Sequence, residues 1–297
     1  MGELVQNMSS ELAGIVEAAG RWAVRVEGRR RMPATGIAWT TSGVIATASH
    51  VVERDEDLWI GLGPDERLAA QIIGRDPTTD LAALQVEGAE LAAAELAGGD
   101  GLAVGHLVLA LGRPGKTVQA TLGIVSALGD AWRTPSGGQV DQYLQTDVVM
   151  YPGFSGGPLV DMQGKVLGLN TSAMGGVSLA LPTSTIQRVV EALQTHGRVR
   201  RGYLGVGLQP ARLPNGVAEQ LGQESGLLIL SVESDSPAEQ GGLTLGDTLL
   251  SLEDQPIRHM DDLMVLLAGE RVGKKAGLQV LRGGKVQKLT VTVGERP

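Results

Sequence analysis

Short apolar runs bounded by glycine, proline and polar residues dominate the first two thirds of the chain. Such runs, rich in Val, Ile, Leu and Thr, are typical of β-strands joined by turns. They predict strands at 22–26, 36–40, 43–48, 57–62, 69–76 and 81–86, and then at 106–112, 116–127, 143–146, 158–161, 166–171 and 177–181. A turn rich in Gly and Asp at 98–101 separates the two groups. The pattern therefore predicts a mainly β region in two halves, of barrel or sandwich type.

Helical spacing of apolar residues occurs at both ends of this region. Residues 9–20 place apolar side chains at helical intervals between a capping serine and a final glycine, which predicts a short amphipathic helix. A second helix is expected to begin with Thr183 or Ser184 as its cap and to end near Gly197. Its apolar face is formed by Ile186, Val189, Val190 and Leu193.

The last third of the chain has a different pattern, with strands and short helices mixed. Strands are expected at 203–208, 227–232 and 247–252, helices after Ser236-Pro237 and at 260–268, and a hairpin at 278–293 around Gly283-Gly284. The polar stretch before this unit suits a domain boundary. The expected organisation is therefore a first domain at 1–197, a linker at 198–202 and a second domain at 203–297.

The composition is that of a globular protein with aliphatic cores. Hydrophobic residues make up 42% of the 297 residues, charged residues 20% and aromatic residues 3%. No apolar run approaches the roughly 18 residues needed to cross a bilayer, so no membrane segment is expected. The net charge of −8 argues against nucleic acid as a partner, because phosphate binding requires clustered Lys and Arg. The short basic clusters at 29–31 and 198–201 are interpreted as solvated loops.

Cysteine is absent, which excludes a thiol nucleophile, a disulfide framework and a thiolate metal site. The histidines lie too far apart to suggest a metal site, and no nucleotide-binding fingerprint is present, so neither a metal nor a cofactor is expected. The N-terminal residues contain no basic segment followed by an apolar core, so no export signal is visible. The chain is expected in the cytoplasm as it stands, or in the periplasm or outside the cell if a signal has been removed.

Three short segments carry residues suited to nucleophilic catalysis. His50 lies in Thr-Ala-Ser-His-Val-Val, Asp80 in Thr-Asp-Leu-Ala, and Ser155 in Gly-Phe-Ser-Gly-Gly-Pro. A serine becomes nucleophilic beside an imidazole, and the imidazole needs a carboxylate that fixes its tautomer and stabilises its charge. The first β half would supply His50 and Asp80, and the second would supply Ser155. Each residue taken singly is more often structural, so the argument depends on their combination.

The glycine-flanked turn around Ser155 allows the backbone to approach a ligand closely. The N–H groups of Gly153 and Ser155 are the expected donors of an oxyanion hole, with Phe154 as a further contributor. A Phe154 N–H that points into the cleft would indicate a formed hole, and one that points away would indicate a resting enzyme.

These motifs resemble those of the HtrA (Deg) family of trypsin-fold serine proteases with a C-terminal PDZ domain. The family patterns are Thr-Asn-x-His-Val-Val, Thr-Asp-Leu-Ala and Gly-Asn-Ser-Gly-Gly-Pro, and the similarity includes Asn-Thr-Ser at 170–172 and Ala-Leu-Pro at 180–182. The resemblance implies two six-stranded β-barrels followed by a small α+β PDZ domain. It implies a serine endopeptidase that acts on unfolded or damaged proteins in protein quality control. It also implies a trimer with N-terminal contacts, a region where Trp22 is the only aromatic residue.

The resemblance further assigns a substrate pocket. The sixth residue before the nucleophile would form its floor, and the uncharged segment after residue 168 would form a wall. The expected pocket residues are Val149, Asn170, Thr171 and Ser172, which predict cleavage after small or medium aliphatic residues. Phe154 departs from the family pattern, which usually has Asn there. It is expected to alter the leaving-group side of the cleft, to cover the serine in a resting state, or simply to pack.

The start of the second domain resembles the carboxylate-binding loop of PDZ domains, which hold peptide C-termini by β-augmentation. The expected peptide-binding residues are Tyr203, Leu204, Gly205, Val206, Leu263 and Leu267. Ordinary core residues of a small α+β unit remain the alternative. For the whole chain, the rival function is an inactive protease-fold module that binds partners, or a chaperone module, acting through the PDZ domain.

Overall fold

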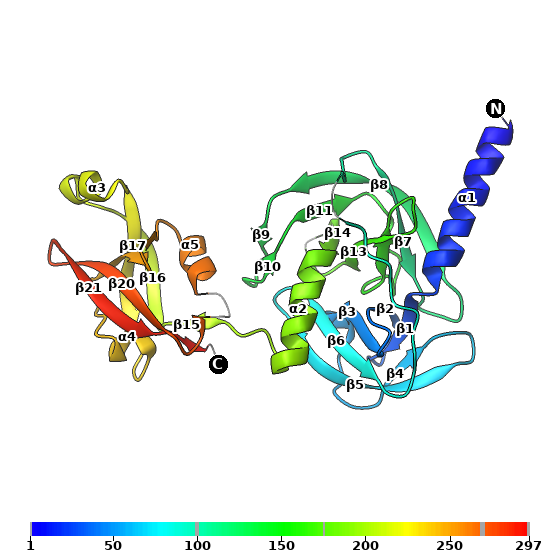
Figure 1. The fold of residues 1–297 in the computed structure, drawn as a ribbon, viewed down its shortest axis with the longest axis horizontal. Coiled ribbons are helices and arrows are strands. Elements are labelled where there is room, and N and C mark those ends of the chain that lie inside the picture. Colours follow the sequence, from blue (N-terminus) through cyan, green and yellow to red (C-terminus); the bar gives the residue numbers. More distant parts are fainter. Residues whose placement is uncertain (1, 99–100, 175, 268–270, 296–297) are drawn as a thin grey trace. The chain divides into compact units, whose positions relative to one another are not determined.

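The computed structural model describes residues 2–98, 101–174, 176–267 and 271–295. The chain divides into two units, Met1–Val199 and Arg200–Pro297, and each is described by itself (Figure 1). The division falls inside the stretch that the sequence marks as a linker. Among the described helices, none is both long enough and apolar enough to span a membrane.

The first unit begins its β structure with a closed barrel of six strands. In the order of pairing β1-β2-β3-β6-β5-β4, each strand joins an antiparallel neighbour. The strands are β1 (Ala23–Glu27), β2 (Ala34–Ala38), β3 (Val44–Ala48), β4 (Leu58–Gly61), β5 (Arg67–Asp76) and β6 (Leu81–Val86). Every residue of β2 and β3 is buried, so these two strands form the centre of the barrel core.

A second closed barrel follows, with the order β11-β14-β13-β12-β7-β8. Its strands are β7 (Leu107–Gly112), β8 (Gln119–Gly129), β11 (Tyr143–Thr146), β12 (Pro158–Val160), β13 (Val166–Thr171) and β14 (Ser178–Pro182). A two-stranded sheet of β9 (Trp132–Arg133) and β10 (Gln139–Val140), which the apolar pattern did not predict, lies outside this barrel's strand order. The prediction of two six-stranded barrels is confirmed.

Helix α2 (Thr183–His196) packs against β5, β6 and β13, and its predicted apolar residues are buried. Pro182 occupies the N-cap without a side-chain hydrogen bond, so the expected cap at Thr183 or Ser184 is wrong and both residues lie inside the helix. Gly197 ends the helix in the left-handed conformation, at φ 70°. Helix α1 (Gly2–Gly20) begins before residue 9, where the pattern predicted its start, and only Ala19 and Gly20 are buried.

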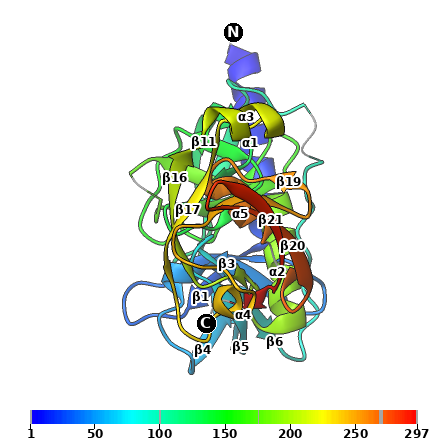
Figure 2. The ribbon, with the colours of Figure 1, turned by 90° about the vertical axis from the view of Figure 1, so that its left-hand side faces the viewer.

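The second unit is built on an antiparallel sheet in the order β16-β17-β18-β20-β21, which Figures 1 and 2 show from two directions. The predicted strand at 203–208 is interrupted at Leu204 and Gly205, because Gly205 has φ 79°. Helix α3 was not predicted, and the expected helix end at Ala268 lies outside the described residues. The elements are β15 (Gly202–Tyr203), β16 (Val206–Arg212), α3 (Asn215–Leu221), β17 (Ser225–Val232), α4 (Pro237–Gln240), β18 (Thr248–Leu252), β19 (Gln255–Pro256), α5 (Met260–Leu266), β20 (Lys275–Arg282), β21 (Lys285–Thr292) and β22 (Gly294–Glu295).

Candidate active site

The pairing of β3 with β6 brings His50 and Asp80 together. The last residue of β3, Ala48, lies opposite the first residue of β6, Leu81. Because the strands are antiparallel, the residues after β3 and those before β6 lie at the same end of the barrel. The Ser49 N–H donates to the Asp80 carbonyl oxygen at 3.0 Å and fixes this junction.

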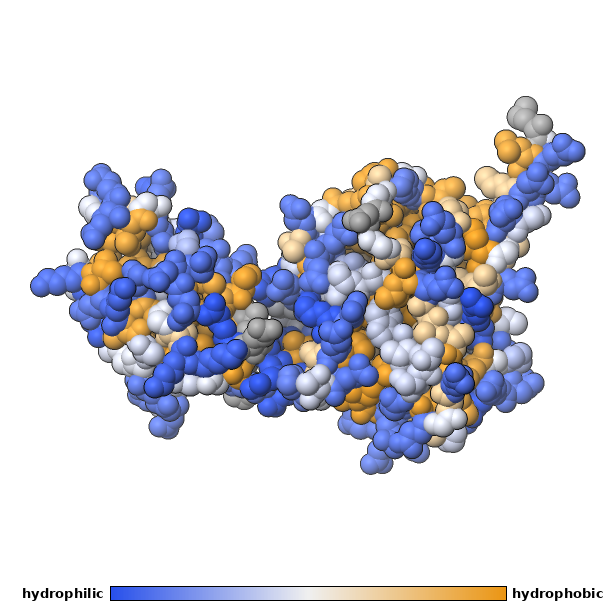
Figure 3. All heavy atoms as spheres, in the orientation of Figure 1, coloured by the Kyte–Doolittle hydropathy of each residue, from blue (hydrophilic) through white to orange (hydrophobic). Residues whose placement is uncertain are grey.

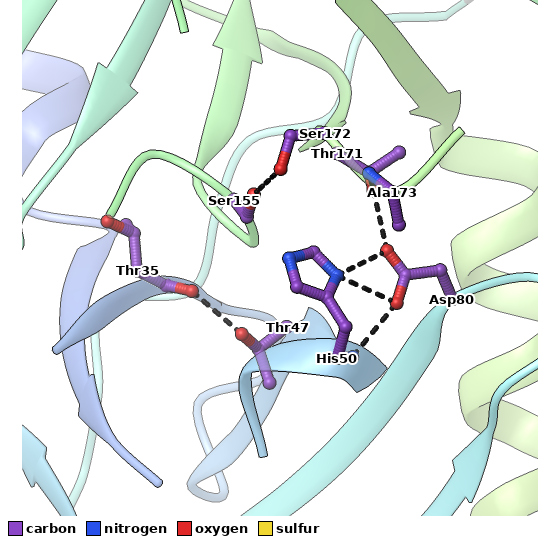
Figure 4. A network of polar contacts seen from close by, with 8 residues as sticks. All are labelled: Thr35, Thr47, His50, Asp80, Ser155, Thr171, Ser172 and Ala173. Carbon is purple, nitrogen blue, oxygen red and sulfur yellow. Dashed lines mark hydrogen bonds and ion pairs between the residues drawn. The ribbon is translucent and has the colours of Figure 1, made fainter. Parts of the chain in front are cut away.

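His50 and Asp80 form a close pair (Figure 4). The His50 Nδ1 lies 2.8 Å from Asp80 Oδ2 and 3.0 Å from Oδ1, and the His50 backbone N–H donates to Oδ1 at 2.9 Å. The Thr171 hydroxyl donates to Oδ2 at 2.5 Å. Since a carboxylate only accepts, Nδ1 carries a proton, and the other ring nitrogen, Nε2, is free to accept one.

The turn before β6 gives Asp80 its position. Asp80 has φ 58°, a left-handed conformation that Asp tolerates better than most residues. The Asp76 carboxylate accepts hydrogen bonds from the hydroxyls of Thr78 and Thr79, at 2.7 and 2.8 Å, and so closes the turn. The Asp-Pro-Thr-Thr-Asp segment therefore uses one carboxylate to build the loop and the other to hold the imidazole.

The Ser155 loop is held against the first barrel by threonines of β2 and β3. The Thr35 N–H donates to the Ser155 carbonyl at 3.3 Å, and the Thr35 hydroxyl donates to the Gly153 carbonyl at 2.7 Å. The Thr47 hydroxyl in turn donates to the Thr35 carbonyl at 2.7 Å. A side chain at Gly156, which has φ 87°, would collide with Thr35 and Thr47, so this position requires glycine.

The Ser155 hydroxyl points to Ser172 in this structure. The two Oγ atoms lie 2.9 Å apart, and among the described residues the Ser155 hydroxyl has no other hydrogen-bond partner. Figure 4 shows the His50 ring lying between the Asp80 carboxylate and the Ser155 loop, without a bond to the serine. The three predicted residues are therefore brought together, but the link from Ser155 to His50 is open.

The oxyanion donors divide into two groups. The Phe154 N–H donates to the Tyr151 carbonyl at 3.0 Å, so it points away from the cleft, which is the arrangement expected of a resting enzyme, and its expected contribution to the hole is corrected. Within the described part of the chain, the N–H groups of Gly153 and Ser155 meet no acceptor. These two groups are thus available to a developing negative charge.

The Phe154 side chain packs. It is fully buried in the core of the second barrel, and its ring meets that of Tyr151 edge to face, with 5.8 Å between the centroids. A side chain at Gly112 would collide with the Phe154 ring, so the two positions are matched in size. Of the three expectations for Phe154, packing is confirmed, and the ring does not cover Ser155.

A pocket of about 290 Å³ opens beside the triad. Its walls come from both barrels and are formed by Arg29, Arg31, Met32, His50, Met150, Tyr151, Pro152, Gly153, Ser155 and Ser172. Neither Met32 nor Met150 was predicted. The two arginines had been assigned to a solvated loop. Their clustering in the sequence was the one available signal that they could belong to a site.

Three of the four predicted pocket residues do not line this pocket. Val149 is 54% exposed and lies outside the pocket, while the next residue, Met150, lines it. Asn170 and Thr171 are buried with their side chains hydrogen-bonded to Gly157 and Asp80. They are corrected to supporting positions, and Ser172 alone lines the pocket as predicted.

In the second unit, the predicted peptide-binding residues lie in two settings. Tyr203 and Val206 flank the Leu204-Gly205 break, and Val206 opens β16. Leu204, Leu263 and Leu267 belong to the buried core of this unit. Because these leucine side chains are buried, they could contribute only the floor of a peptide-binding groove. Their role in peptide binding stays a prediction. Within the described residues, no group of His, Asp and Glu is arranged to hold a metal ion.

The two barrels, the His50–Asp80 pair and the nearby serine define the class of a trypsin-like serine peptidase. The model of the trypsin-like peptidase domain matches residues 34–169, and the model of the PDZ domain matches residues 202–293. The chain therefore consists of a trypsin-like peptidase domain followed by a PDZ domain.

Solved structures define the family more closely. The HtrA-type protease AlgW with a decapeptide is 29% identical, with a TM-score of 0.80, over 96% of this chain and 98% of that chain. AlgW with a tripeptide is 32% identical, with a TM-score of 0.77, over 96% of this chain and 97% of that chain. The chain belongs to the HtrA family of serine endoproteases.

Curated relatives carry the name "Probable periplasmic serine endoprotease DegP-like". The protein from Pseudomonas savastanoi pv. phaseolicola is 38% identical over 270 residues, which are 89% of this chain and 56% of the relative. The protein from Marinomonas sp. is 36% identical over 287 residues, which are 94% of this chain and 60% of the relative. The chain thus spans less than two thirds of the length of these relatives.

Proposed function

We propose that the chain is a serine endopeptidase in which Ser155 is the nucleophile, His50 the general base and Asp80 the group that orients the base. The observation that carries this proposal is the 2.8 Å contact between His50 Nδ1 and Asp80 Oδ2 beside the pocket that Ser155 lines. This contact leaves Nε2 as the proton acceptor on the side of the serine.

The proposed reaction begins when substrate displaces the Ser155 hydroxyl from Ser172. Ser155 Oγ attacks the carbonyl carbon of the scissile bond as its proton passes to His50 Nε2. The resulting oxyanion accepts hydrogen bonds from the N–H groups of Gly153 and Ser155. The C–N bond then breaks, and His50 gives the proton to the leaving amine while the acyl group stays on Ser155.

Water completes the proposed cycle. His50 removes a proton from the water molecule as its oxygen attacks the acyl carbon, and Ser155 recovers its hydroxyl when the new C-terminus leaves. During both steps the imidazole becomes positively charged, and the Asp80 carboxylate stabilises it. The Thr171 hydroxyl keeps that carboxylate in place.

The proposed preference is for a small or medium aliphatic residue before the scissile bond. The second-barrel part of the pocket is formed by Met150, Tyr151 and Pro152, and no acidic residue is among the residues that line the pocket. A positively charged substrate side chain would find no carboxylate there, whereas an aliphatic one would bury apolar surface. A preference for cleavage after Lys or Arg would contradict this part of the proposal.

The PDZ domain is proposed to bind peptide C-termini at the Leu204-Gly205 break. Among the described residues, the backbone N–H groups of Leu204 and Gly205 donate to no acceptor, which suits a carboxylate nest. The names of the AlgW structures, which contain peptides, support peptide binding. Unfolded or damaged proteins are the proposed substrates.

Assembly and compartment are also proposals. Trp22 is 3% exposed and is therefore unsuited to an interface, but α1 carries the exposed apolar residues Leu4, Val5 and Met8 (Figure 3). A trimer through this helix would cover them, and light scattering would give the mass of three chains. The names of the curated relatives support a periplasmic location, which cell fractionation would test.

A fluorophosphonate probe tests the proposed activity, because it reacts with an activated serine. We expect labelling of the wild type, loss of labelling in Ser155→Ala and His50→Ala, and normal labelling in Ser184→Ala, whose hydroxyl lies on the exposed side of α2. Absence of labelling in the wild type, with and without a PDZ-binding peptide, would instead support the inactive binding module. Suppression of aggregation that persists in Ser155→Ala would add a chaperone function.

A further inference from the structure

Two arginines at the pocket have no part in the proposed triad chemistry. Arg29 and Arg31 lie in the loop between β1 and β2, at 28–33, and both line the pocket beside His50 and Ser155. Arg29 is half-buried, and its Nε donates to the Met32 carbonyl at 2.8 Å, which holds its stem against its own loop. The loop therefore presents positive charge at the reaction centre.

This loop is fixed to the segment that follows His50. The Gly28 carbonyl accepts the N–H groups of Glu53 and Arg54 at 2.8 and 3.2 Å. A side chain at Gly28 would come within 3.1 Å of the Val51 carbonyl, so the two backbones are closely packed. The arginines thus have a defined position relative to the general base.

The two barrels supply different walls of the pocket. Residues 150–153, Ser155 and Ser172 come from the second barrel, and His50 and the loop at 28–33 come from the first. In the proposed reaction the acyl half of the substrate remains on Ser155, whereas His50 must reach the leaving amine. The loop fixed behind His50 is therefore on the leaving-group side of the scissile bond.

The charges at this wall are unbalanced. Arg31 pairs with Glu53 at 3.1 Å, but its side chain is 76% exposed, and Glu53 is not among the residues that line the pocket. Burial, together with the nearby positive charge of Arg31, lowers the pKa of Arg29, and Glu53 opposes this only in part. Two guanidinium groups thus share one carboxylate, and the surplus charge faces the pocket.

We propose that Arg29 and Arg31 select substrates with an acidic residue at the first or second position after the scissile bond. This inference rests on the proposed proteolytic function and adds a determinant on the side opposite to the aliphatic pocket. Guanidinium groups bind carboxylates with well-oriented charge-assisted hydrogen bonds, and a partly enclosed site strengthens that attraction. A substrate carboxylate would supply the second negative charge that the two guanidinium groups need.

A peptide library tests this inference on the full chain. Each peptide carries an aliphatic residue before the scissile bond and Asp, Glu, Asn, Gln, Lys or Arg at the two positions after it. We expect acidic peptides to be cleaved with kcat/KM about fivefold above their amide counterparts, and basic peptides to be cleaved more slowly than both. The preference should decrease as the salt concentration rises.

Charge reversal gives the matched comparison. Arg29→Glu and Arg31→Glu should abolish or invert the preference, measured within each variant as the ratio of kcat/KM for the acidic peptides to kcat/KM for the Asn and Gln peptides, and the melting temperature of each variant shows whether it folds. Arg30→Glu changes the same charge on an exposed residue that does not line the pocket, and should leave the preference unchanged. Equal cleavage of acidic and amide peptides by the wild type would overturn the inference but not the proposed proteolytic function. The same holds if Arg30→Glu changes the preference as much as Arg29→Glu or Arg31→Glu does. If no peptide is cleaved, the proposed function fails and the inference with it.

Discussion

Each domain contains a buried aspartate, and the two carboxylates are held in opposite ways. In the PDZ domain, Asp247 is paired at both oxygens with Arg282, through Nε and Nη2 at 2.7 Å each. The Thr244 N–H adds a third bond at 2.8 Å. Burial alone would raise the pKa of Asp247, but these bonds and the charge of Arg282 hold it below the ordinary carboxyl value.

In the protease domain, Asp80 has only uncharged donors among the described residues. They are the backbone N–H and Nδ1 of His50 and the hydroxyl of Thr171. A permanent cation beside Asp80 would neutralise it and leave nothing to stabilise an imidazolium. The Asp247 carboxylate is therefore neutralised by Arg282 in the folded domain, whereas the Asp80 carboxylate gains a positively charged partner only when His50 takes a proton.

Of the substitutions that test the difference between the two aspartates, Asp80→Asn should have the largest effect, a loss of catalytic rate. An amide that donates to Nδ1 stabilises the wrong tautomer of His50, so that Nε2 carries the proton and cannot accept one. We expect kcat on an aliphatic peptide to fall about 10⁴-fold, with a melting temperature close to that of the wild type. A variant that keeps a tenth of its activity would show that Asp80 does not orient the base.

Asp247→Asn should lower stability and leave the catalytic rate unchanged, the reverse of Asp80→Asn. Removing one partner of a largely buried ion pair is expected to cost the PDZ domain about 2–3 kcal/mol, a value reduced because Arg282 is partly exposed. Cleavage of short peptides should be unchanged, because the substitution lies in the other domain. Urea titration followed by limited proteolysis would measure the domain separately, with Glu219→Gln, an exposed position on α3, as the control.

The pH dependence of the stability of the PDZ domain gives a further test of the Asp247–Arg282 ion pair. The folded-state pKa of Asp247 is lowered, so its ion pair contributes fully above the ordinary carboxyl pKa of about 4. That contribution is lost as the pH falls through the folded-state pKa. The difference in stability between wild type and Asp247→Asn should therefore be constant near neutrality and shrink in acid; a difference that grows in acid would contradict the assignment.

Much of the fold could be predicted from apolar runs and turn residues. The bounds of β6, β11 and β13 agree with the pattern to the residue. β13 is buried throughout and β6 at all but one position, whereas buried and half-buried residues alternate along β11, and both patterns are typical of strands. The interruption at Leu204-Gly205 was missed, since Gly205 at φ 79° breaks a segment whose composition still favours a strand. The early start of α1 was missed for a different reason, because most of its residues are exposed and carry little amphipathic signal.

The site was only half predictable. Motifs identified His50, Asp80 and Ser155, and strand pairing then explains how residues far apart in the sequence meet. Side-chain direction was not predictable. The uncharged segment around Thr171 fits a pocket wall or a buried support equally well, and tertiary packing decides between them. The place of Arg31 at the pocket depends on how its loop packs against the segment after His50, which no local pattern contains.

Ser172→Ala should give the smallest effect. It tests whether the hydrogen bond to Ser172 keeps the Ser155 hydroxyl away from His50. The Ser155 hydroxyl rests 2.9 Å from Ser172 Oγ instead of bonding to His50, so removal of this partner should favour rotation toward the imidazole. A net hydrogen bond of about 1 kcal/mol predicts a rise of about threefold to fivefold in the rate of fluorophosphonate labelling. Ser184→Ala should have no effect. A slower rate in Ser172→Ala would mean that this hydroxyl steers the nucleophile into place, and the open link would then be a step of catalysis and not a resting contact.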